Sequence, residues 1–245
     1  LLSCTEKVKT FPLQWRSLWI SVKIPGNCPE GKYPITIEFS QTEQKIHKEV
    51  QFELTVLPAV LPEQTLMHTE WFHADCLARQ YNVDVWSEAH WTLLGKYFRN
   101  MAEHGINLLL TPLFTLPLDT KEGGERPTSQ LVDVYLETGK YRFDFQRLES
   151  WIKLAQECGI DHFEMSHLFT QWGGKYTPKI IVDCDGVKEK KFGWHVKSLS
   201  EEYISFLEAF LPELLVFLDK AGIRQKCYFH ISDEPHLEDL QHYKE

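Results

Sequence analysis

The stretch Ile106-Asn-Leu-Leu-Leu-Thr111 decides the fold class, because it is a short, mostly apolar run that directly follows a predicted helix. Runs of this kind are typical of parallel strands that are covered on both faces. The preceding helix is predicted to begin after the N-cap Ser87 and to end near His104, where Gly105 stops it. The stretch therefore predicts a strand inside a buried parallel sheet.

The same rhythm of strand and helix recurs along the chain. Helices are predicted at 145–158 and from Ser200 to about 221, a hairpin at 131–145, and an irregular stretch at 169–198. Four strand–helix units in series predict a parallel α/β architecture, either an open sheet or a (β/α)₈ TIM barrel. A complete barrel takes roughly 250 residues, so a barrel here would be truncated to its first half. The predicted core strands are 66–72, 106–111, 162–167 and 226–231.

The first part of the chain has a different pattern. Apolar and polar residues alternate at 17–24, 33–39 and 50–56, as in strands with one buried and one wet face. We therefore expect a β-sandwich segment at 1–57 that precedes the barrel. The prolines at 58 and 62 indicate a linker at 58–65, and residues 66–245 form the predicted catalytic part.

Composition excludes several classes of partner. The 245 residues carry a net charge of −9, which argues against nucleic-acid binding, since phosphate recognition needs clustered basic residues. No run of about 18 apolar residues is present, so no membrane span is expected. The acidic chain, with six scattered cysteines, favours the cytoplasm over secretion, with an export signal before residue 1 as the alternative.

An adjacent pair of acids ends the last predicted strand, in His230-Ile-Ser-Asp-Glu-Pro235. Active sites of parallel α/β folds assemble at this edge of the sheet. Neighbouring carboxyl groups can divide their roles, one staying ionised while the other donates a proton. Pro235 is expected to keep Glu234 extended. The alternative is that Asp233 and Glu234 are solvated acids that open a helix at Pro235.

Aromatic and hydrogen-bonding residues follow the other predicted strands at the same edge. Carbohydrate sites combine aromatic platforms with fixed polar groups that bind hydroxyls. The alternative is that the tryptophans fill the core and the histidines bond locally. The candidate platforms are Trp71, Trp172 and Trp194, and the candidate hydrogen-bonding residues are His73, Asp75, His167 and Gln171.

Cofactor and metal chemistry compete with this interpretation. A metal-dependent hydrolase would use His73, Asp75 and His167, but neither an HExxH motif nor another diagnostic spacing occurs. Gly-rich phosphate loops are also missing from the sequence, and Cys76 near His73 is a weak candidate nucleophile. We therefore expect neither a metal nor a cofactor.

The chain resembles glycoside hydrolase family 123 and its uncharacterised bacterial relatives. The likeness runs from about residue 66 to the end, and its most specific parts are the segment around Ser166–Gly173 and the terminal acid pair. The other segments that carry it are Trp71-Phe-His-Ala-Asp-Cys76, Ile106-Asn-Leu-Leu-Leu-Thr-Pro112 and Phe192-Gly-Trp194.

This resemblance implies a retaining β-N-acetylgalactosaminidase with a (β/α)₈ barrel, in which the 2-acetamido group of the sugar is the nucleophile. Carried over to this chain, Glu234 would be the general acid/base and Asp233 would orient the acetamido group. The expected partner is an N-acetylhexosaminide, and a non-catalytic carbohydrate-binding protein is the alternative. The open strand edges of a half-barrel are expected to be covered by another chain, a swapped segment or a second half of the same protein. The isolated chain is therefore expected to be catalytically weak or inactive, because the pocket wall opposite Glu234 would be missing.

Overall fold

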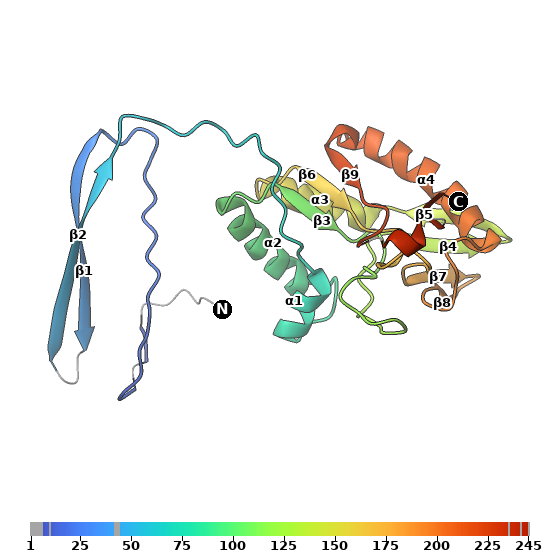
Figure 1. Cartoon of the computed structure of the whole chain (residues 1–245), viewed down its shortest axis with the longest axis horizontal. Coiled ribbons are helices and arrows are strands. Elements are labelled where there is room, and N and C mark those ends of the chain that lie inside the picture. The colour runs from blue at the N-terminus through green and yellow to red at the C-terminus, as the bar shows by residue number, and fades with distance from the viewer. Residues whose placement is uncertain (1–6, 10, 42–44, 235, 241, 245) are drawn as a thin grey trace. The chain divides into compact units, whose positions relative to one another are not determined.

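The computed structural model describes residues 7–9, 11–41, 45–234, 236–240 and 242–244 (Figure 1). The chain forms two compact units, Leu1–Glu63 and Gln64–Glu245, and each is described by itself. The boundary lies inside the predicted linker. Among the described residues, no helix has the length and apolar character needed to cross a membrane.

The described residues of the first unit contain one antiparallel hairpin. Strand β1 (Gly31–Gln41) pairs with β2 (Ile46–Val56) along their whole length, with Gly31 opposite Val56. These strands match two of the three predicted in this region. The third prediction, at 17–24, was wrong, because that segment forms no strand. Its alternating residues lack a hydrogen-bonded neighbouring strand in the described part, and alternation alone does not make a ladder.

The second unit has a mixed α/β fold built around a parallel sheet. Strands β3 (Leu108–Thr111), β6 (His162–Met165) and β9 (Cys227–Phe229) lie in that order, with β6 in the centre. Three of the four predicted core strands are therefore confirmed, although the last is shorter than expected. In the described residues this sheet has three strands and does not close into a barrel.

Four α-helices accompany the sheets in the part of the chain that the structure describes. Helix α2 (Glu88–Glu103) is capped by Ser87, whose Oγ accepts a hydrogen bond from the His90 backbone N–H at 3.2 Å. Helices α3 (Gln146–Glu157) and α4 (Glu201–Lys220) also occur where they were predicted. The short α1 (Ala74–Tyr81) was not predicted. The helices bury apolar residues at helical spacing, including Leu94, Phe98 and Met101 from α2 and Phe206, Phe210 and Leu214 from α4.

Residues 66–72 are not a strand, contrary to the prediction, although they run beside β3. The His68 carbonyl accepts hydrogen bonds from the backbone N–H groups of Asn107 and Leu108, at 3.1 and 3.2 Å. The Asn107 side chain accepts from the His68 N–H at 2.8 Å. Because these bonds converge on one residue and use a side chain, they hold the segment in place without forming a ladder.

A second sheet occupies part of the stretch that was predicted to be irregular. Its strand order is β5 (Lys140–Asp144), β4 (Asp133–Glu137), β7 (Ile180–Cys184) and β8 (Val187–Phe192). The β4–β5 pair confirms the predicted hairpin. The β7–β8 hairpin was missed because charged residues interrupt its apolar alternation. Its turn is formed by Asp185 and Gly186, both with positive φ angles, and an Asp-Gly pair of this kind is a strong hairpin signal.

Candidate functional site

The acid pair lies on the loop after β9, next to a loop that follows β6. The Trp172 indole Nε1–H donates to Glu234 Oε2 at 2.8 Å, and the Trp172 backbone N–H donates to the Asp233 carbonyl at 3.0 Å. Asp233 is partly buried and Glu234 is exposed. The structure therefore brings together three of the predicted site residues, from segments about 60 positions apart.

Two residues at this junction have unusual backbone geometry. Trp172 and Glu234 have φ angles of 58° and 48°, in the left-handed region that residues other than glycine rarely adopt. The expectation that Pro235 keeps Glu234 extended was therefore wrong. The two hydrogen bonds from Trp172 hold the turn in this conformation, and strained backbone of this kind clusters at functional sites.

A cluster of aromatic and acidic side chains gathers near the acid pair. The Trp71 indole N–H donates to both carboxylate oxygens of Glu164, each at 3.2 Å. His230 Nδ1 lies 3.1 Å from Glu164 Oε1. The His167 ring centroid lies 4.0 Å from that of His230 and 5.4 Å from that of Trp71. One ligand atom from each of His167, His230 and Asp233 falls within 4.8 Å of the others, which ties this cluster to the acid pair.

His167 is the most deeply buried member of this cluster. Its exposed fraction is 0%, and burial, aided by the charge that His230 can carry, lowers its pKa from 6.5 to about 3. The His167 imidazole is therefore uncharged at neutral pH. Neither of its ring nitrogens has a hydrogen-bond partner among the described residues.

The predicted residues His73, Asp75 and Gln171 meet in a separate network. His73 Nε2 lies 2.9 Å from Asp119 Oδ2, and the Asp119 backbone N–H donates to Gln171 Oε1 at 3.3 Å. Arg126 donates to both carboxylate oxygens of Asp75, at 2.9 and 3.0 Å. Burial, followed by the positive charge of Arg126, lowers the pKa of His73, and the nearby Asp119 opposes this shift.

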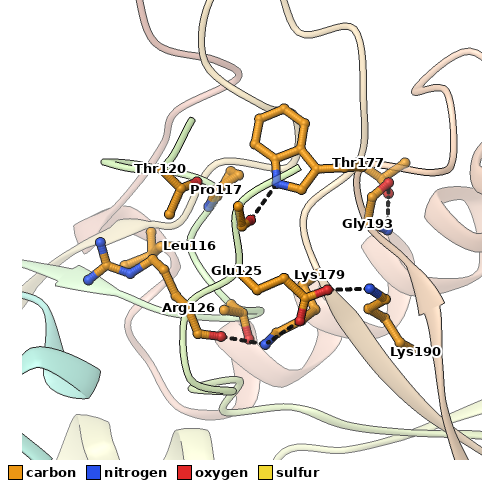
Figure 2. Close-up of a pocket in the computed structure, with 12 residues that line it drawn as sticks. Leu116, Pro117, Thr120, Glu125, Arg126, Thr177, Lys179, Lys190 and Gly193 are labelled. Atoms are coloured by element: carbon orange, nitrogen blue, oxygen red, sulfur yellow. Dashed lines mark hydrogen bonds and ion pairs between the residues drawn. The ribbon is translucent and has the colours of Figure 1, made fainter. Parts of the chain in front are cut away.

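Trp194 lies beside a small cavity. Its indole N–H donates to the Gly124 carbonyl at 2.8 Å. The cavity has a volume of about 20 Å³, room for about one water molecule and too little for a sugar ring. Figure 2 shows Glu125 on its wall between Lys179 and Lys190, both of which form ion pairs with the Glu125 carboxylate. Neither Asp233 nor Glu234 lines this cavity.

Three residues of the site were not predicted as functional. Glu164, Asp119 and Arg126 each connect two of the predicted residues or their neighbours. Glu164 offered a signal in the sequence, because it is an acid between the apolar residues Phe163 and Met165 of a predicted core strand. Asp119 and Arg126 lie in a loop with no such pattern, and only the fold brings them to His73 and Asp75.

Comparison with known proteins identifies the family. Residues 71–245 match the profile described as "Glycoside hydrolase 123, catalytic domain". The chain belongs to glycoside hydrolase family 123. The resemblance seen in the sequence is thus confirmed, over more than two thirds of the chain.

A solved structure of family 123 has the same fold. The family 123 glycoside hydrolase from Clostridium perfringens superposes with a TM-score of 0.66 at 19% sequence identity. The match covers 90% of this chain and 39% of that one, so the chain spans well under half the length of this relative. That structure was determined in a study of glycolipid glycan hydrolysis. No curated protein matches this family 123 chain in sequence.

Proposed function

We propose that the chain provides the acid pair of a retaining glycoside hydrolase, which releases terminal β-linked N-acetylhexosamine by substrate-assisted catalysis. The observation that carries this proposal is the junction at which Trp172 binds Glu234 through its indole and Asp233 through its backbone. At this junction the Glu234 carboxyl group lies against the partly exposed Trp172 indole, and Asp233 precedes it in the chain, at the carboxyl end of a parallel sheet. Membership of family 123 supports the reaction class.

In the proposed mechanism, Glu234 acts first as general acid. It protonates the glycosidic oxygen while the acetamido carbonyl oxygen attacks C1, so that the leaving group departs and an oxazolinium ion forms. Asp233 accepts a hydrogen bond from the acetamido N–H and offsets the positive charge of this ion. Glu234 then removes a proton from the water that attacks C1. Two inversions at C1 return the β configuration, and no protein nucleophile is needed on the opposite face of the sugar.

Other side chains are proposed to hold the sugar. The rings of Trp71 and Trp172 are 38% and 42% exposed, so each can offer a face to sugar C–H groups. His167 has free hydrogen-bonding capacity in the described structure. We assign His73, Asp75, Gln171 and Trp194 to the walls of the wider site, where their contacts described above fix the loops around it.

We propose N-acetylgalactosamine as the sugar, on the strength of the family resemblance. The test compares hydrolysis of an aryl β-N-acetylgalactosaminide with that of the glucosaminide and follows the first-formed product by NMR. We expect faster turnover of the galactosaminide and initial release of the β anomer. Release of the α anomer would contradict a retaining mechanism. Binding of the sugar without turnover would favour the alternative, a non-catalytic carbohydrate-binding protein.

The architecture around the site is part of the same proposal. We infer that the parallel sheet of the second unit belongs to a (β/α)₈-type barrel and that the β1–β2 hairpin belongs to a β-sandwich. The alternative metal-dependent hydrolase built on His73, Asp75 and His167 loses support, because Arg126 occupies both carboxylate oxygens of Asp75.

A further inference from the structure

Three potential metal ligands, one of them Asp233 of the acid pair, converge in one place. His167 follows β6, and His230 and Asp233 follow β9, so adjacent parallel strands deliver them to one place. Their ligand atoms lie within 4.8 Å of one another. Since these residues are far apart in the sequence, no short motif could have revealed the group.

The state of His167 indicates that a ligand is needed there. A neutral imidazole has one donor and one acceptor nitrogen, and both nitrogens of His167 are buried without a partner in the described part of the chain. A buried polar group left without a partner destabilises the folded state, at a cost in free energy. A ligand that bonds to His167 would remove part of this cost.

Neighbouring residues orient the second histidine as in known metal sites. Metal-binding histidines usually give their other ring nitrogen to a carboxylate, which fixes the ring and its tautomer. Here the Glu164 carboxylate lies 3.1 Å from His230 Nδ1, and the Trp71 indole fixes Glu164 in turn through two hydrogen bonds. The cluster therefore has an outer layer of support as well as three potential ligands.

We propose that His167, His230 and Asp233 bind a divalent transition-metal ion of the Zn²⁺ class. Two imidazoles and one carboxylate suit Zn²⁺, whereas Mg²⁺ and Ca²⁺ prefer oxygen ligands alone. Ligand atoms about 2.0–2.2 Å from a shared ion require these side chains to move closer together and the two imidazole rings, whose centroids lie 4.0 Å apart, to turn a nitrogen toward it, with water completing the tetrahedron.

The bound ion acts as an inhibitor of the hydrolase. This consequence rests on the proposed function, in which the Asp233 carboxylate must be free to hold the acetamido group. A Zn²⁺ ion on Asp233 occupies that carboxylate and places a positive charge where the oxazolinium ion would form. Substrate and metal therefore compete for the same site.

The test measures Zn²⁺ and Mg²⁺ binding to the full chain by titration calorimetry, without substrate. The wild type should bind one Zn²⁺ far more tightly than Mg²⁺. Asp233→Asn, which keeps the shape of the side chain, and His230→Ala should each weaken Zn²⁺ binding at least tenfold. Glu164→Gln should weaken it by about 10–100-fold, as is typical for partners of metal-binding histidines. The matched control is His195→Ala, which removes an exposed histidine outside the cluster and should leave binding unchanged.

Two results would overturn the metal site: Zn²⁺ binding no tighter than that of Mg²⁺, or equal binding by wild type, Asp233→Asn and His230→Ala. The inhibitory role is tested separately, on aryl N-acetylhexosaminide hydrolysis. Zn²⁺ should raise the apparent KM without lowering kcat, and unchanged kinetics at saturating Zn²⁺ would refute competition. Because calorimetry needs no turnover, its result on the metal site stands whether or not the hydrolysis assay supports the proposed function.

Discussion

The Glu234 carboxyl group accepts a hydrogen bond from the Trp172 indole. The same carboxyl group is proposed to donate the proton in catalysis. We expect Glu234→Gln to lose about 10²–10⁴-fold in kcat/KM on substrates with poor leaving groups. Activated aryl substrates should lose much less, because their leaving groups need little protonation. The measurement is a series of aryl glycosides of increasing leaving-group pKa. Equal losses along the series would show that Glu234 is not the acid.

Substitution of Asp233 should impair a different step, since Asp233 is proposed to orient the acetamido group that acts as the nucleophile. Asp233→Asn should be impaired on good and poor leaving groups alike, because attack by the acetamido group is weakened in both. A thiazoline analogue of the cyclic intermediate should inhibit the wild type and bind the variant more weakly. Unchanged inhibition would remove Asp233 from the proposed mechanism.

Gly173 follows Trp172 and permits the turn that holds Glu234. Its φ angle is 99°, and an added Cβ would lie 2.5–2.7 Å from carboxylate atoms of the buried Asp239. Gly173→Ala should therefore lower the free energy of unfolding by more than the roughly 1–2 kcal/mol expected for a left-handed backbone alone. Gly123→Ala is the matched control, with a φ of 77° and no atom within 4 Å of the added Cβ. Equal losses in urea unfolding would refute the close approach.

At the scale of elements, the start of α2 depends on an uncharged histidine. His90 Nε2 lies 2.9 Å from the Ala74 carbonyl, and Nδ1 accepts from the Trp86 backbone N–H at 3.0 Å, so the neutral Nε2–H tautomer satisfies both. Burial lowers the pKa of His90, and the Ala74 contact and the charge of Asp75 oppose the shift only in part. The unfolded chain therefore takes up this proton at a higher pH than the folded one.

His90 should thus stabilise the fold above about pH 6.5 and lose this contribution as the pH falls below that value. We expect His90→Gln to be less stable at pH 7 but to show a weaker loss of stability between pH 7 and pH 5. Urea unfolding at several pH values measures this difference. His195→Gln should keep the wild-type dependence, because His195 is exposed. A His90→Gln curve parallel to the wild type would contradict the assignment.

Local signals predicted most of the regular elements. Ser87 and Ser200 were recognised as helix caps, and the hydroxyl of each accepts a backbone N–H. Mostly apolar runs located β3, β6 and β9, although in β9 both Tyr228 and Phe229 are exposed. The segment at 66–72 was wrongly predicted to be a strand. It is held beside β3 by the Asn107 side chain, and sequence periodicity cannot reveal a contact of this kind.

Only those site residues that directly follow a predicted strand could be predicted from the sequence. Trp172, Asp233 and Glu234 follow two neighbouring strands, so the topology brought them together as expected. The partners Asp119 and Arg126 come from a loop whose path is set by tertiary contacts. No pattern of residue types in the sequence predicts the path of such a loop.

At the scale of the whole molecule, the edge of the parallel sheet formed by β9 is a candidate surface for association between chains. β9 pairs with β6 on one side only within the described residues, and Tyr228, Phe229 and Ile231 are exposed. Open apolar edges promote pairing between chains. We expect the chain to associate as its concentration rises, as measured by sedimentation velocity.

Phe229→Lys should reduce this association, because a charge on an edge strand opposes pairing. The matched control is Val216→Lys, which adds the same charge at an exposed apolar position on α4. A wild-type chain that stays monomeric at every concentration would contradict the prediction. So would equal effects of the two substitutions.

The tryptophans of the two units differ in exposure, and their fluorescence should differ accordingly. Trp15 and Trp19 in the first unit are 95% and 79% exposed, whereas Trp151 in the second is fully buried against Phe98. A buried indole emits at shorter wavelength than a hydrated one and is shielded from a dissolved quencher such as acrylamide. Quenching the exposed tryptophans should therefore leave a blue-shifted emission dominated by the second unit, so that its unfolding can be followed without cutting the chain.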